Sequence, residues 1–175
     1  MRRTSTGRLL AALLLATLSI GCKLATQGDP EIPMVTIPNS FVAATSGEIA
    51  AAFDGTATTI PAFGANPRTV ELRSTAFPAV YVLFSKGILG SGSFDFAEGE
   101  YSLAGVPGFR DVDAIFYLSA AVGDEFFATS GSLEIVNSGP TIIRGRFDFT
   151  GTSLSGAATR RVRVRGTFWS VPAAP

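Results

Sequence analysis

Short runs of β-type residues, separated by turn residues at intervals of about ten residues, constrain this chain more than any other feature. They begin near Gly47 and continue to the end of the sequence. Beyond the first 22 residues, no stretch of ten or more residues has the apolar period of an amphipathic helix. We therefore expect an all-β fold: an antiparallel β-sandwich of about eight to ten short strands or, alternatively, a closed or flattened β-barrel.

The apolar runs also place the expected strands. These cover residues 69–74, 79–85, 100–104, 113–121, 125–129, 131–137, 141–150 and 161–171. Before them, the pair Asp54-Gly55 favours a two-residue hairpin turn between two further strands. The runs at 79–85 and 113–121 are apolar at odd and even positions alike, so we expect central strands that are covered on both faces.

The clearest alternation of side chains lies near the C-terminus, where every second residue of two expected strands is polar or charged. If these strands pair, they share an outward face with five arginines and the single tryptophan of the chain. The residues of this face are Arg144, Arg146, Arg161, Arg163, Arg165 and Trp169. Such a face is a candidate contact for an anion or a glycan, with Arg165 and Trp169 as a cation–π pair or a sugar platform.

A solvent-exposed face laced with ion pairs is the simpler interpretation of the same residues, and we favour it. The registers that we expect place Asp148 opposite Arg163 and Glu134 opposite Arg144. Each such cross-strand pair of opposite charges stabilises a sheet by about 0.2–1 kcal/mol.

The middle of the chain is acidic, with seven carboxylates between Asp95 and Glu125 opposed only by Arg110. Five of them are candidate oxygen ligands for calcium: Asp95, Glu98, Glu100, Asp111 and Asp113. Their spacing differs from that of a dedicated calcium loop, so we favour loop solubility as their role.

Catalysis has few candidate groups, because the chain has no histidine and one cysteine. Serine, cysteine and metal-dependent sites that need histidine are therefore excluded. Two carboxylates of the acidic middle could hydrolyse a glycosidic bond, which is the least favoured alternative. We expect a protein that is not an enzyme and binds no cofactor.

The first 22 residues have the pattern of a targeting segment. Arginines precede an apolar run at 9–18, which is shorter than the about 20 residues that a membrane-spanning helix needs. Small residues stand at the third and first positions before Cys22, and the stretch LSIGCKL resembles the lipobox of bacterial lipoproteins. Ser19 and Ile20 depart from the usual lipobox, which leaves a plain secretory signal as the alternative. The resemblance implies acylation of Cys22, and Lys23 after it implies the outer membrane.

This interpretation divides the chain into three parts: a signal peptide at 1–21, a lipidated N-terminus and flexible tether at 22–46, and a β-rich domain at 47–175. Cleavage before Cys22 leaves 154 residues (175 minus 21), enough for one domain with its own core. The three arginines of the signal peptide leave 11 basic against 14 acidic residues, which argues against a nucleic-acid partner.

Several segments of the domain resemble those of small bacterial lipoproteins of unknown function: AAFDGTA, GEYSL, SGSLEI, IRGRFDFTG and VRGTFWSV. The similarity covers residues 47–171. It implies a lipobox, a short tether and a single β-rich domain, and it brings no activity and no binding residues.

Together these features predict a lipid-anchored lipoprotein of the cell envelope that acts as a non-catalytic binding or interaction module. The expected partners are the membrane, through the lipid, and a glycan or an envelope protein. The alternative is a barrel that carries a small apolar ligand, which a mouth lined by Phe and Tyr would distinguish from a filled core.

Overall fold

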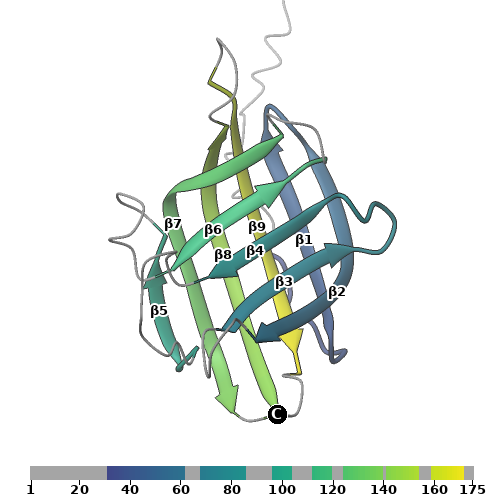
Figure 1. The fold of residues 1–175 in the computed structure, drawn as a ribbon, viewed down its shortest axis with the longest axis vertical. Coiled ribbons are helices and arrows are strands. Elements are labelled where there is room, and N and C mark those ends of the chain that lie inside the picture. Colours follow the sequence, from purple (N-terminus) through teal and green to yellow (C-terminus); the bar gives the residue numbers. More distant parts are fainter. Residues whose placement is uncertain are drawn as a thin grey trace, which may run out of the picture. The chain divides into compact units, whose positions relative to one another are not determined.

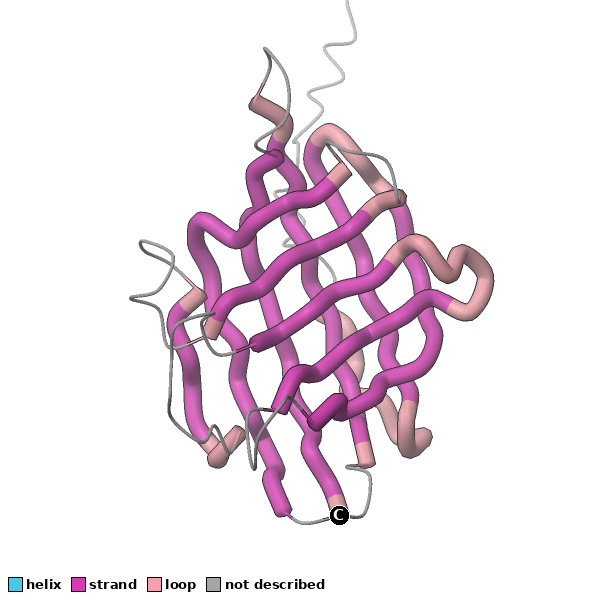
Figure 2. The backbone as a smooth tube through the Cα atoms, viewed as in Figure 1, coloured by secondary structure: helices cyan, strands magenta, loops and turns pink. Residues whose placement is uncertain are grey.

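A computed structural model describes residues 31–61, 68–85, 96–103, 112–119, 124–139, 141–153 and 159–171. These residues form nine strands and no helix (Figures 1 and 2). The strands are β1 (Ser40–Gly47), β2 (Ala51–Pro61), β3 (Arg68–Ser74), β4 (Tyr81–Ser85), β5 (Gly99–Ser102), β6 (Asp113–Tyr117), β7 (Glu125–Gly139), β8 (Ile142–Ser153) and β9 (Arg161–Ser170).

Eight antiparallel strands close into a barrel in the order β7-β6-β4-β3-β2-β1-β9-β8, with β8 pairing back to β7. The first residues of β7 pair with β6, and its later residues pair with the short strand β5. The all-β prediction is confirmed in the form of its alternative, the closed barrel. Closure leaves the eight strands with paired neighbours on both sides, which a sandwich of two open sheets does not achieve.

The inside of the barrel is packed with aromatic side chains. Along β8 and β9, buried residues alternate with outward-facing ones. The largest buried side chains are phenylalanines: Phe41, Phe84, Phe96, Phe116, Phe126, Phe147, Phe149 and Phe168. Full burial of one such side chain stabilises a fold by about 1.5–3 kcal/mol, so these rings carry much of the core.

Two glycines make room for two of these rings. Gly145 lies opposite Phe168, and Gly166 lies opposite Phe147 on the same pair of strands. A Cβ at Gly166 would lie 2.5 Å from the Phe147 ring, and one at Gly145 would lie 2.8 Å from the Phe168 ring. On each of the two strands, a glycine therefore lies opposite a phenylalanine of the other strand, as the narrow interior of a small barrel requires.

The expected hairpin turn at Asp54-Gly55 is wrong. Both residues lie inside β2, and the chain turns earlier, after Gly47, whose φ is +98°. Gly55 is needed for a different reason, since a Cβ there would overlap the carbonyl oxygen of Arg73 on β3. The local turn signal of Asp-Gly is overridden by the close approach of the neighbouring strand.

The expected start of the domain at Gly47 is also too late, because β1 occupies Ser40–Gly47 between β2 and β9. Residues 31–36 form a strap against the outside of β8 and β9. The Arg144 Nη2 donates a hydrogen bond to the carbonyl of Val35 at 2.7 Å, and the Thr167 hydroxyl donates to the carbonyl of Pro33 at 2.8 Å.

The expected leader at 1–21 and the lipidation site Cys22 lie outside the described residues. In the part of the chain that the structure does describe, no helix is long and apolar enough to span a membrane.

The expected registers of the last strands are wrong by two residues. Arg165, rather than Arg163, lies opposite Asp148, and Arg146, rather than Arg144, lies opposite Glu134. The shift of two keeps every side chain on its expected face. The expected strands 125–129 and 131–137 form one strand, β7, whose pairing with β8 is irregular between Ala128 and Ser130 and between Ile135 and Asn137.

Candidate functional site

The arginine face is present on the outside of β8 and β9, but carboxylates of the same face pair with two of its arginines. The Arg146 Nε lies 2.5 Å from Glu134, and the Arg163 Nε and Nη2 donate to the two oxygens of Asp148 at 2.9 and 2.7 Å. The hydrogen bond that Arg146 donates to Glu134 is the main cause that raises the pKa of Arg146. The expected ion pair of Asp148 with Arg163 is therefore present, although Arg165 lies directly opposite Asp148, and Glu134 pairs with Arg146 rather than with Arg144.

The tryptophan of this face stacks on a different arginine from the expected one. The Arg144 guanidinium lies over the Trp169 ring at 4.7 Å, whereas Arg165 was the expected cation. Arg144 is opposite Trp169 in the ladder, which explains the choice. One side of the indole is therefore covered by the chain's own guanidinium.

A groove of about 290 Å³ lies between the strap and the outside of β7, β8 and β9. Its charged lining consists of Glu31, Glu134, Arg146, Asp148 and Arg165. Three carboxylates and two guanidiniums line it, so the groove offers contacts of both signs rather than a cationic site for an anion.

The candidate calcium ligands do not come together in the described residues. Asp95 and Asp111 lie outside them, and no group of three acidic side chains among the others is arranged to hold a metal ion. Glu98 accepts a hydrogen bond from the backbone N–H of Ser138 at 3.3 Å, while Asp113 and Glu100 stand on separate strands, β6 and β5.

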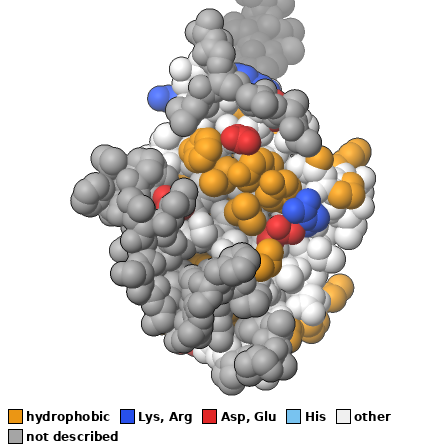
Figure 3. All heavy atoms as spheres, viewed as in Figure 1, with side chains coloured by type: hydrophobic (Ala, Val, Ile, Leu, Met, Phe, Trp, Pro, Cys, Tyr) orange, Lys and Arg blue, Asp and Glu red, His pale blue; other side chains and the backbone are white. Residues whose placement is uncertain are grey.

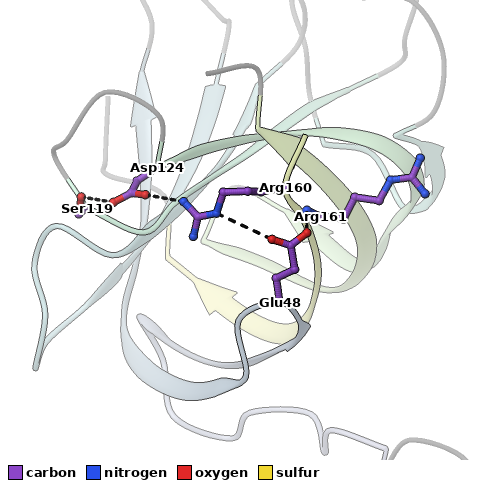
Figure 4. A network of polar contacts seen from close by, with 5 residues as sticks. All are labelled: Glu48, Ser119, Asp124, Arg160 and Arg161. Carbon is purple, nitrogen blue, oxygen red and sulfur yellow. Dashed lines mark hydrogen bonds and ion pairs between the residues drawn. The ribbon is translucent and has the colours of Figure 1, made fainter. Parts of the chain in front are cut away.

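A polar network that the alternation did not predict lies between the turns before β2, β7 and β9 (Figure 4). Arg160 donates to Asp124 at 2.9 Å, approaches Glu48 at 4.0 Å and lies over the Phe126 ring at 5.3 Å. Hydrogen bonds from Ser119 and then Arg160 lower the pKa of Asp124. The backbone N–H of Arg161 also donates to Glu48, at 2.9 Å. The network joins three segments of the barrel and has the character of a structural tie.

The outside of β4, β6 and β7 carries a group of half-buried apolar and aromatic side chains that we name the tyrosine patch. Its members are Tyr81, Leu83, Ile115, Tyr117 and Phe127. In the space-filling view, hydrophobic side chains gather over these strands, with acidic and basic groups at the margin (Figure 3). The register aligns Leu83, Ile115 and Phe127 in one row across the three strands and Tyr81 and Tyr117 in the next.

The two tyrosines of the patch are stacked, with ring centroids 4.3 Å apart and planes at 16°. On the β3 side, the Arg73 guanidinium lies 4.3 Å from the Tyr81 centroid and is paired with Glu71 at 2.7 Å. On the β7 side, Tyr117 lies opposite the exposed Glu125. Burial raises the pKa of Tyr117, and the nearby Tyr81 and Glu125 act in the same direction.

The sequence contains the signal for this patch, but our interpretation of it was wrong. The apolar residues at both parities of 79–85 and 113–121 predicted strands covered on both faces. In a closed barrel only the inward side chains are enclosed, so those of β4 and β6 alternate between buried and half-buried. The outward apolar residues are the patch.

Comparison of the chain with protein-family models, with curated proteins and with solved structures gives no match.

Proposed function

We propose that this chain is a lipid-anchored lipoprotein of the bacterial cell envelope whose barrel is a non-catalytic binding module for a partner protein. The tyrosine patch is the docking surface. The observation that carries the proposal is the half-buried cluster of two tyrosines, one phenylalanine and two aliphatic residues on a face with no described segment over it. Contiguous apolar patches of this kind are typical of protein–protein contact sites, and tyrosine is enriched there.

The packed interior favours a binding site on the outer surface of the barrel. It argues against the alternative, a barrel that carries a small apolar ligand. Phe84 contacts three other rings at centroid distances of 5.1, 6.3 and 6.2 Å, those of Phe147, Phe149 and Phe168. A carrier of the same size needs the interior volume that these rings fill.

The chemistry of the described carboxylates favours binding over hydrolysis of a glycan. A general acid needs a raised pKa, whereas the pKa of Asp124 is lowered by Ser119 and Arg160. Asp148 and Glu134 are both engaged by arginines.

The anchor in this proposal is an acylated Cys22. Two acyl chains, at about 0.8 kcal/mol per buried CH₂, give stable attachment to a bilayer, whereas a single chain gives only reversible binding. Attachment would keep the patch at the envelope, where the partner is to be found, and Lys23 favours the outer membrane.

Radical footprinting tests the docking surface. The oxidation of Tyr117, Leu83 and Phe127 is compared between the purified full chain in detergent and the chain in intact cells. Ile37 and Val136, which are exposed by 68% and 47% and lie outside the patch, are the internal controls. We expect protection of the patch alone in cells. Equal oxidation of the patch in both samples contradicts the proposal.

A further inference from the structure

The two ends of the tyrosine stack differ in the charged groups that contact them. At the β3 end, the face of Tyr81 is covered by Arg73. That guanidinium is held in place by Glu71 at 2.7 Å and by the carbonyl of Pro78 at 2.5 Å. Cation, aromatic ring and carboxylate thus form a complete unit within the chain.

At the β7 end, the ring and the carboxylate are present and the cation is missing among the described residues. Tyr117 faces Glu125 across the strand pair. No described arginine pairs with Glu125, and none lies over the Tyr117 ring. Glu125 is exposed and therefore accessible to a side chain from another molecule.

We propose that this end of the patch receives a cationic side chain, the guanidinium of arginine or the ammonium of lysine, from the partner protein. The cation stacks on Tyr117 and pairs with Glu125, as Arg73 does with Tyr81 and Glu71. The apolar neighbours of that cation in the partner contact Leu83, Ile115 and Phe127. This inference rests on the docking function proposed above and adds the chemistry of the partner: a protein segment in which a basic residue stands among apolar ones.

Charge complementarity favours this occupant. The open end of the stack offers a carboxylate, which repels the phosphate of a lipid headgroup or the carboxylate of an acidic glycan. A desolvated aromatic face beside a carboxylate is instead the environment in which guanidinium groups bind best, since stacking and pairing act together.

The test uses the full chain in detergent and two tripeptides, acetyl-Leu-Arg-Leu-amide and its citrulline counterpart, which keeps the shape of arginine without its charge. Binding is followed by NMR at the methyl groups of Leu83 and Ile115. We expect the arginine peptide to bind about three- to tenfold more tightly than the citrulline peptide, the range that an exposed cation–π contact and ion pair give together.

Glu125→Gln should remove this preference, so that the two peptides bind that variant equally. Glu100→Gln, which changes an exposed carboxylate on β5, is the matched control and should keep the preference. Equal affinities of the two peptides in the parent chain, or loss of the preference in both variants, overturn the cation contact. Neither result removes the docking surface, because footprinting in cells measures it independently.

The cation could also come from the same chain, from Lys86 or Arg110, which lie outside the described residues. The double variant Lys86→Gln, Arg110→Gln decides this. An unchanged affinity for the arginine peptide supports a partner's cation. An affinity that rises about threefold or more assigns the position to this chain and overturns the proposal.

Discussion

At the scale of single residues, the barrel depends on positions where only glycine leaves room for a ring. Gly166 and Gly145 each lie under a phenylalanine of the opposite strand. The alternation along these strands places both glycines on the inward face, so their burial could be predicted from the sequence. Which ring covers which glycine could not, because it depends on the register.

We predict that Gly166→Ala lowers the free energy of unfolding by about 1–3 kcal/mol, the usual effect of forcing extra volume into a packed core. The added Cβ would meet the Phe147 ring and the Val42 carbonyl oxygen, both at 2.5 Å. Urea unfolding measures the change. Gly139→Ala is the control, since its Cβ would meet only Ile142 at an ordinary 3.6 Å. Equal stabilities of the two variants would falsify the packing argument.

The Asp124 carboxylate gives a second prediction at this scale. Because its pKa is lowered in the fold, its contribution is present above the pKa of the unfolded chain and is lost as the pH falls through the folded value. We expect Asp124→Asn to lower the free energy of unfolding by about 1 kcal/mol near neutral pH and to have no effect in strong acid. Urea unfolding at several pH values checks this, and a difference that does not change with pH contradicts it.

At the scale of elements, the strap at 31–36 ties the segment before β1 to the last two strands. Arg144 donates a hydrogen bond to the carbonyl of Val35 in the strap and lies over the ring of Trp169 on β9. The strap could not be predicted, since its single proline and its polar residues are equally typical of a tether. β1 was hidden for the same reason, while most strands after it were placed to within a few residues.

Arg144→Ala should lower the free energy of unfolding by about 1–2 kcal/mol, because it removes both the hydrogen bond and the stacked guanidinium. The emission of Trp169, the single tryptophan of the chain, should also change. Arg161→Ala on the same face should be neutral, since that side chain is exposed. The same loss from both substitutions would mean that the face acts only through its total charge.

At the scale of the whole molecule, the sequence predicts many short strands but not whether they close. Sandwiches and barrels share the same alternation and turn spacing, and the pairing of β7 with β8, which closes this barrel, is a long-range choice. The tyrosine patch was missed because the sequence left open whether the strands close into a barrel. Outward apolar residues on β4 and β6 could be assigned to the surface only once the barrel was known to be closed.

The anchor belongs to this scale as well. We predict that Cys22→Ser moves the protein from the membrane fraction to the soluble fraction, because no acyl chain can then be attached. Fractionation of cells that express the parent or the variant chain measures this. A variant that stays with the membranes would show that attachment does not depend on Cys22.

The central claim is that the barrel binds a protein through the tyrosine patch, and site-specific photocrosslinking in living cells tests it most directly. A photoreactive phenylalanine analogue replaces Phe127 in the patch or, as the control, Thr58, which is exposed on the outside of β2. We predict one discrete crosslinked species from position 127, none from position 58, and loss of the species when Ile115 is also changed to Ser. The same species from both positions, or none from position 127, would contradict the account.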